Sequence, residues 1–207
     1  MLTDLLKKIH WLGHDGFRFH ADKIVYIDPY QLRADLPKAD LILVTHQHSD
    51  HFSPADIERI RKADTSIVTI AEVAKKVRGD VVVVKPGSKV VVQGVAIEAV
   101  PAYNTNKHFH PKAAGHVGFI VTVDGKRIYH AGDTDVIPEM AGFKVDVALL
   151  SVSGTYVMTA DEAIEAARLI KPEAAIPMHY GAIVGGQSDA ERFAAGSPVQ
   201  TVILTAE

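Results

Sequence analysis

The sequence predicts an α+β fold with four layers, an αββα sandwich in which two mostly antiparallel sheets pack between outer helices. Each half of the chain is rich in strand patterns and then continues into helical segments. Two segments, 41–44 and 145–150, fit strands that are buried on both faces. No repeat, linker or low-complexity segment separates the halves, so we treat residues 1–207 as a single domain.

The first half alternates in the manner of strands. Segments 8–12, 16–20 and 23–27 are predicted to be short antiparallel strands joined by tight turns. A helix should follow the buried strand at 41–44, because Ser53 can cap it, Pro54 suits its first position and Asp56 completes a capping box. Further strands are expected at 66–69, 81–84, 89–92 and 95–100, with a short helix near 71–77.

The second half begins with segment 101–115, which has no periodicity and is predicted to be a long loop of functional kind. Segments 117–123 and 127–129 should form a hairpin around Asp124-Gly125. Thr159 and Glu162 form a capping box that opens an amphipathic helix, and this helix should stop before Pro172. Strands at 174–177 and 199–204, with a helix at 188–194 between them, complete the prediction.

Composition narrows the class of protein. The chain is 47% hydrophobic and 23% charged, with a net charge of −3, which is typical of a globular protein. It has no apolar run of the roughly 18 to 20 residues that a membrane span needs, and its first residues lack the features of a signal peptide. We therefore expect a cytoplasmic protein without a membrane partner. The mild acidic balance disfavours nucleic acid as a partner, while an oligomer stays open.

Residue usage also limits the metal chemistry. The chain has no cysteine, so any metal ion must be held by nitrogen and oxygen ligands. Against that background, eleven histidines in 207 residues is a high count.

The clearest chemical signal is a histidine-rich segment that comes directly after the buried strand at 41–44. It reads Thr45-His46-Gln47-His48-Ser49-Asp50-His51. Two residues apart, His46 and His48 project to the same side of an extended backbone, and Asp50 and His51 can face a second point as the chain turns. Three imidazoles and a carboxylate suit Zn²⁺. The alternative is a polar surface loop with several histidines by chance.

This segment resembles the signature Thr-His-x-His-x-Asp-His of the metallo-β-lactamase superfamily, whose fold is the αββα sandwich. Two later segments, 131–134 (Ala-Gly-Asp-Thr) and 177–180 (Pro-Met-His-Tyr), resemble later motifs of that family. Segments 11–14 and 27–30 resemble its branch of ascorbate-6-phosphate lactonase and related metal-dependent hydrolases. The resemblance implies that His46 and His48 bind a first ion, that Asp50, His51 and His179 bind a second, and that Asp133 lies between them.

The resemblance implies one more histidine for the first ion, from the loop that begins at Pro101. The nearest matching place holds Tyr103-Asn104, and His108, His110 and His116 follow. We predict His110, which lies beside Pro111 in the loop, over His116 on the hairpin. The alternatives are that His110 contacts substrate, or that Asn104 or water completes the site.

Residues around the motif suggest supporting roles. Asp28 could accept the free N–H of a ligating histidine, and His14 could line the substrate pocket. A plain turn is the alternative for both. Lys107 and Lys112 could receive an anionic group, although solvated loop lysines are the commoner case.

The predicted activity is hydrolysis with the help of the bound metal ions. Two divalent ions, zinc first and manganese or iron as alternatives, can share a water and lower its pKa until it forms hydroxide. We therefore expect a hydrolase acting on an ester, lactone or phosphodiester of a small molecule, including anionic ones. Asp50 would orient the hydroxide, and Asp50, His14 or a second water would protonate the leaving group. The alternatives are a di-iron oxygen-reducing protein of the same fold, a scaffold without activity and a nuclease.

Overall fold

The computed structural model describes residues 2–207, which form two packed β-sheets with helices on their outer sides. The first sheet has the strand order β1-β2-β3-β4-β5-β6. Its strands are β1 (Ile9–Gly13), β2 (Gly16–His20), β3 (Ile24–Ile27), β4 (Leu41–Val44), β5 (Ser66–Thr69) and β6 (Asp80–Val83).

The second sheet has the order β13-β12-β11-β10-β9-β8-β7. Its strands are β7 (Lys89–Val92), β8 (Val95–Pro101), β9 (Val117–Val123), β10 (Lys126–His130), β11 (Val147–Ser151), β12 (Ala174–Met178) and β13 (Gln200–Thr201). Large apolar side chains from both sheets, among them Phe17, Leu43 and Phe119, are completely buried in the core.

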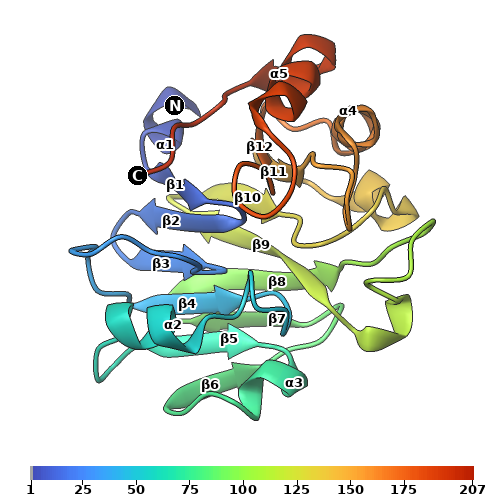
Figure 1. Cartoon of the computed structure of the whole chain (residues 1–207). Coiled ribbons are helices and arrows are strands. Elements are labelled where there is room, and N and C mark those ends of the chain that lie inside the picture. The colour runs from blue at the N-terminus through green and yellow to red at the C-terminus, as the bar shows by residue number, and fades with distance from the viewer. Residues whose placement is uncertain (1) are drawn as a thin grey trace.

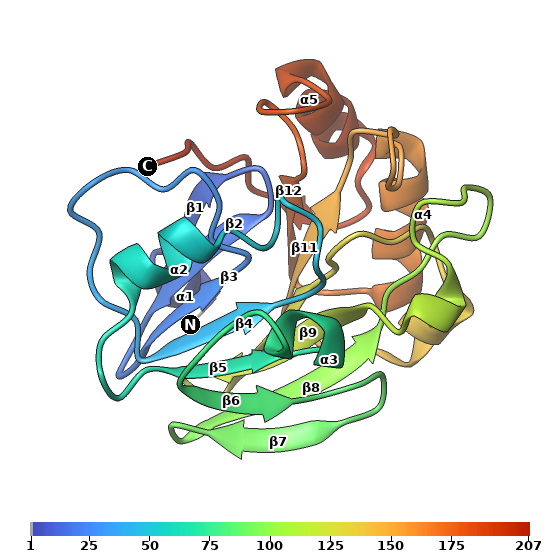
Figure 2. The ribbon, with the colours of Figure 1, turned by 60° about the horizontal axis from the view of Figure 1, so that its bottom comes forward.

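The helices lie outside the sheets, so the predicted αββα sandwich is confirmed (Figures 1 and 2). On the first sheet they are α2 (Pro54–Ile60) and α3 (Ala71–Ala74), and on the second α4 (Ala160–Ile170) and α5 (Gln187–Gly196). Ser53 caps α2 and Thr159 caps α4, as the sequence predicts, because each side-chain oxygen accepts a backbone N–H of the first turn. The predicted capping box of α2 does not form, because the Asp56 carboxylate accepts the backbone N–H groups of Gln31 and Leu32 instead. No helix within residues 2–207 has the length and apolarity to cross a membrane.

The prediction of mostly antiparallel sheets is wrong, because both sheets are mixed. Strands β1 to β3 and β7 to β10 pair antiparallel, whereas β3 to β6 and β10 to β13 pair parallel. For four of the six parallel pairs the physical reason is that α2, α3, α4 and α5 each connect two neighbouring strands, and the segments 28–40 and 131–146 connect the other two pairs. A helical crossover returns the chain to the same end of the sheet, which makes the next strand parallel.

Three further details differ from the prediction. A helix α1 (Leu2–Leu6) precedes the first strand, and two 3₁₀ turns, η1 (Lys112–Ala114) and η2 (Pro138–Gly142), lie in segments predicted to be irregular or left unassigned. The last strand is only Gln200–Thr201 rather than 199–204. The backbone N–H of Val202 still donates to the Ala175 carbonyl, and the chain then runs to Trp11, whose carbonyl accepts the backbone N–H of Glu207.

Parallel pairing has a direct consequence for the site. The carboxyl ends of β3 and β4 lie at one edge of the first sheet, and those of β10, β11 and β12 lie at one edge of the second. The chain therefore presents the residues that follow these strands close together, and ligand sites in α/β sheets commonly form at such an edge.

Candidate metal centre

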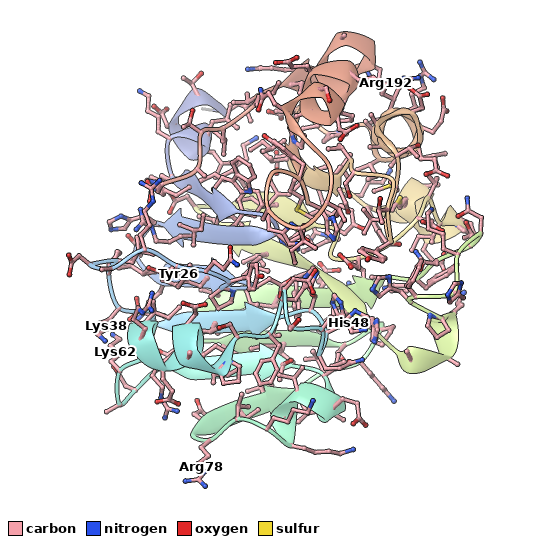
Figure 3. The ribbon with its side chains drawn as sticks, in the orientation of Figure 1. Tyr26, Lys38, His48, Lys62, Arg78 and Arg192 are labelled. Atoms are coloured by element: carbon pink, nitrogen blue, oxygen red, sulfur yellow. The ribbon has the colours of Figure 1, made fainter. Side chains whose placement is uncertain are left out.

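One group of four side chains gathers just beyond the end of β4. His46, His48, His110 and Asp133 each offer a ligand atom within 4.8 Å of the others. His48 Nδ1 lies 3.1 Å from both His46 Nε2 and His110 Nε2, and His110 Nε2 lies 3.1 Å from Asp133 Oδ2. Figure 3 shows His48 beyond the end of β4, next to the loop that follows β8. Two atoms that each bind one ion at about 2.1 Å in tetrahedral geometry lie about 3.4 Å apart, which these distances approach.

A second group lies on the other side of Asp133. It contains His14, Asp15, His51 and His179, again with ligand atoms within 4.8 Å of one another. Asp133 Oδ1 is 3.1 Å from His51 Nε2 and 3.3 Å from His179 Nε2. Asp133 thus directs one carboxylate oxygen to each group, as a bridging ligand of two ions would.

The backbone conformations that produce this convergence are uncommon. Gly132, which turns the chain from β10 toward Asp133, has φ +60°, and a Cβ there would lie 3.0 Å from the carbonyl oxygen of Val117. His14, Asp28 and His179 also have positive φ values of 50°, 45° and 61°. Such strained conformations in residues other than glycine concentrate at functional sites.

Hydrogen bonds behind the rings fix which nitrogen faces the centre. His51 Nδ1 lies 2.8 Å from Asp28 Oδ2, and the same carboxylate accepts both the backbone N–H and the hydroxyl of Thr45. His179 Nδ1 lies 2.9 Å from Ser153 Oγ, and His110 Nδ1 lies 3.2 Å from Asn104 Oδ1. These partners hold the Nδ1 proton, so the Nε2 lone pair is free for a cation.

The residues present fit divalent ions. Asp133 Oδ1, His51 Nε2 and His179 Nε2 are buried and have no hydrogen-bond partner within residues 2–207. Buried polar atoms are nearly always paired, so several unpaired atoms directed at one point fit a site for a cation. Six imidazoles and two carboxylates, without sulfur, are donors that suit zinc, manganese or iron.

The electrostatics differ between the two groups. Burial lowers the pKa of His46 well below its ordinary value, and the neighbouring His51 lowers it further. Burial also opposes charge on His51 and His179, yet Asp133 together with Asp28 or Asp15 raises the pKa of both, that of His179 to about 9. The second group therefore attracts positive charge, and an ion that binds there must displace protons.

Asp50 lies outside both groups of four. Its Oδ2 is 3.1 Å from His14 Nε2 and 3.6 Å from His51 Nε2, so it borders the second group. Burial would raise the pKa of Asp50, but the hydrogen bond from His14 and the charge of His51 lower it, to about 2. Its place as a ligand of the second ion stays a prediction, and its ionised carboxylate faces the cavity described next.

A cavity of about 300 Å³ opens over the centre. Polar residues of the site form its floor, and three larger side chains form its wall, namely Phe109, Tyr156 and Ile183. The rings of Phe109 and Tyr156 meet edge to face with centroids 4.7 Å apart, and Phe109 and Ile183 are 41% and 50% exposed. The opening of the site is therefore apolar.

The structure separates the candidates for the last ligand of the first group. His110 is in the group, whereas His116 stacks on His46 with ring centroids 4.8 Å apart and directs Nε2 to Gln47. Asn104 is 8% exposed and holds His110 rather than facing the centre. The geometry thus agrees with the choice of His110, whose role as a ligand stays a prediction.

The candidate lysines lie apart from the centre. Lys107 pairs with Asp135 at 2.6 Å, and Lys112 pairs with Glu139 at 2.9 Å. Asp15 is the site residue that sequence reasoning missed, because Gly13-His14-Asp15-Gly16 resembles an ordinary turn. The buried position of that turn, which no local pattern indicates, is the feature that distinguishes it.

Comparison with known proteins gives a consistent result. A family model described as "Beta-lactamase superfamily domain" matches residues 8–179. A UPF0173 metal-dependent hydrolase of Thermoplasma acidophilum is 34% identical, over 97% of this chain and 95% of its own length. Another, of Pyrococcus abyssi, is 37% identical, over 95% of this chain and 96% of its own length.

Solved structures agree. A protein from Parabacteroides distasonis, described as a metal-dependent hydrolase, superimposes with a TM-score of 0.86 at 34% identity, covering 96% of this chain and 93% of its own. The metallohydrolase Igni18 from Ignicoccus hospitalis gives a TM-score of 0.78 at 24% identity, covering 96% and 94%, which supports the fold alone.

Proposed function

Because the chain belongs to the β-lactamase superfamily and is a metal-dependent hydrolase, we propose that it uses two divalent ions to hydrolyse an ester, lactone or phosphodiester of a small molecule. The observation that carries the proposal is the position of Asp133, whose Oδ2 belongs to the first group and whose Oδ1 faces the second. Oδ1 is buried and has no hydrogen-bond partner within residues 2–207, so an ion in the first group alone would leave it unpaired.

The ions are assigned to named residues. His46, His48 and His110 would hold the first ion, His51 and His179 the second, and Asp133 both. Zinc is the first choice of metal and manganese or iron the alternatives. When bound, the two ions supply a water of lowered pKa as the nucleophile and polarise the carbonyl or phosphoryl oxygen of the substrate.

Asp50, positioned by His14, would transfer the proton of the attacking water to the leaving group. The carboxylate of Asp50 lines the cavity and is ionised, so it can accept a hydrogen bond from the attacking water and take its proton. The Nε2–H of His14 donates to Asp50 Oδ2 and keeps the carboxylate in place. Once protonated, Asp50 can deliver the proton to the leaving oxygen.

The cavity suggests the kind of substrate. A volume of about 300 Å³ suits a small molecule, and the wall of Phe109, Tyr156 and Ile183 favours an apolar group next to the bond that breaks. Lys107 and Lys112 are neutralised by Asp135 and Glu139, so neither lysine offers an unpaired charge to an anionic group of the substrate. The substrate is therefore a small molecule rather than a polymer.

The test combines metal analysis with activity. Purified protein should contain two divalent ions per chain and hydrolyse some of a panel of aryl esters, lactones and phosphodiesters. A chelator should abolish turnover, and Zn²⁺ or Mn²⁺ should restore it. A maximum of one ion per chain at saturation would refute the dinuclear centre, and iron-dependent oxygen consumption without hydrolysis would favour the redox alternative.

A further inference from the structure

We propose that Asp15 is a ligand of the second ion, and that it makes the second site prefer harder, oxygen-binding metals than the first. The inference rests on the proposed dinuclear centre and adds a residue to it. Its basis is the burial of Asp15 and the absence of any hydrogen-bond partner for its carboxylate within residues 2–207.

Asp15 lies at the tip of a hairpin that is buried. Gly13 pairs with Gly16, so His14 and Asp15 form the two-residue tip between β1 and β2, and they are 1% and 0% exposed. Hairpin tips ordinarily lie on the surface. This tip is fixed through its backbone, because His179 N donates to the His14 carbonyl at 3.0 Å and His130 Nε2 lies 2.8 Å from the Asp15 carbonyl.

The carboxylate of Asp15 lacks the backbone hydrogen bond that an aspartate in a turn usually accepts. Such side chains commonly accept a nearby backbone N–H, but both oxygens of Asp15 are buried without any such bond. Leaving a carboxylate buried and unpaired is strongly destabilising. The fold therefore places a charge where only a cation could compensate it.

The surroundings of the carboxylate match one shared ion. Asp15 Oδ2 lies 3.4 Å from His51 Nε2 and 3.7 Å from His179 Nε2. These separations are close to the roughly 3.4 Å between two ligands of one tetrahedral ion. They are too long for direct charge-assisted hydrogen bonds, which measure about 2.7 to 2.9 Å. A purely structural pairing of Asp15 with protonated histidines would bring these atoms closer.

The extra carboxylate makes the two sites unequal. The first site has three imidazoles and a share of Asp133, whereas the second has His51 and His179 with both Asp15 and its share of Asp133. Carboxylate-rich sites favour Mn²⁺ relative to imidazole-rich tetrahedral sites, which favour Zn²⁺. The second site should accordingly accept Mn²⁺ while the first retains Zn²⁺.

The experiment compares wild type with Asp15→Asn and Asp15→Ala, using Asp56→Asn as the matched control. Asp56 is also a buried carboxylate, but it accepts the backbone N–H groups of Gln31 and Leu32. Metal-free proteins are titrated with Co²⁺, following its visible absorption, and with Zn²⁺ or Mn²⁺ in competition with a chromophoric chelator. Metal content after gel filtration gives the stoichiometry.

We expect wild type and Asp56→Asn to bind two ions. Both Asp15 variants should keep the first ion, bind the second at least about tenfold more weakly and lose the second-site Mn²⁺. Thermal unfolding of the metal-free proteins gives a readout that is independent of metal. It checks that each metal-free variant is folded, so that weaker binding of the second ion can be assigned to the loss of the Asp15 carboxylate.

The outcomes are distinct. If wild type itself binds no second ion, the proposed dinuclear function fails. If wild type binds two and the Asp15 variants bind the second equally well, the inference about Asp15 alone is overturned.

Discussion

His14 Nε2 and Asp50 Oδ2 lie 3.1 Å apart, although 36 residues separate them in the chain. His14 comes from the hairpin between β1 and β2, and Asp50 follows β4 in the first histidine-rich segment. His14 is 1% exposed, whereas the Asp50 side chain is 16% exposed and lines the cavity. The pair therefore connects a buried imidazole to a carboxylate that substrate can reach.

This pair predicts how two substitutions affect catalysis. Asp50→Asn should lower kcat by about 10² to 10⁴, because the group that takes the proton is lost. His14→Ala should lower kcat less, since it removes only the partner that positions Asp50. Steady-state kinetics of both variants and the double variant check this, with Ser49→Ala, at the same cavity, as the control. Strictly additive losses in the double variant would contradict a shared role.

Asp28 should control metal affinity without touching the ion. Asp28→Asn weakens the bond to His51 Nδ1 and the two bonds from Thr45, so the ring is no longer held. Losses of this kind typically cost about 10- to 100-fold in metal affinity. Chelator competition measures it, and Asp40→Asn, a carboxylate that pairs with Lys62, serves as control. Unchanged affinity would show that the bond to Asp28 does not matter.

His110 and His116 should differ in their effect on the first ion. His110→Ala removes one of the three imidazoles of the first group, whose Nε2 lies 3.1 Å from His48 Nδ1, so metal content should fall by about one ion per chain. His116→Ala removes a ring that stacks on His46 and directs Nε2 to Gln47 rather than to the centre, so both ions should stay. Elemental analysis of the two variants decides the question, and the reverse ranking would reject His110.

Metal-free protein should become less stable as pH rises from about 6.5 to 9. The pKa of His179 is raised to about 9, above the unfolded value, so its contribution is complete below about pH 6.5 and is lost as pH rises through about 9. The loss can reach about 3 kcal/mol. The lowered pKa of His116, about 4, acts in the opposite direction, but its contribution is complete above about pH 6.5.

Denaturant unfolding across this pH range tests the expectation. With saturating Zn²⁺ the decline should disappear, since the ion replaces the protons of the second group and binds more tightly as they leave. Stability of metal-free protein that rises between pH 7 and 9 would contradict the predicted protonation.

Phe109 should influence substrate preference rather than the chemistry. Phe109→Ala removes part of the apolar wall of the cavity and its contact with Tyr156. KM for substrates with an apolar acyl or alkyl group should rise about 5- to 50-fold, with kcat and metal content nearly unchanged. Leu169→Ala, at an exposed apolar residue that does not line this cavity, is the control. An equal effect on a polar substrate would argue against an apolar subsite.

Much of the fold could be predicted from local signals. The apolar run at β4 indicated a buried strand, and the capping residues Ser53 and Thr159 marked where α2 and α4 begin. Those signals depend on residues only a few positions apart, so they can be recognised without knowledge of the rest of the chain. Strand direction cannot be recognised in this way, because it depends on which distant strand is the neighbour. The observed sheets are therefore mixed, whereas mostly antiparallel sheets were predicted.

By itself, the sequence determined the ligand chemistry. Without cysteine, and with His46, His48, Asp50 and His51 following one buried strand, only nitrogen and oxygen sites for a divalent ion are available. Tertiary structure alone decided how the distant residues are used. It brought His110, and not His116, into one group with His46 and His48, placed Asp133 between two groups and buried the Asp15 hairpin beside His179. The reason is physical, since the type of a donor is a local property of the chain, whereas coordination requires atoms from separate strands to meet within a few ångströms.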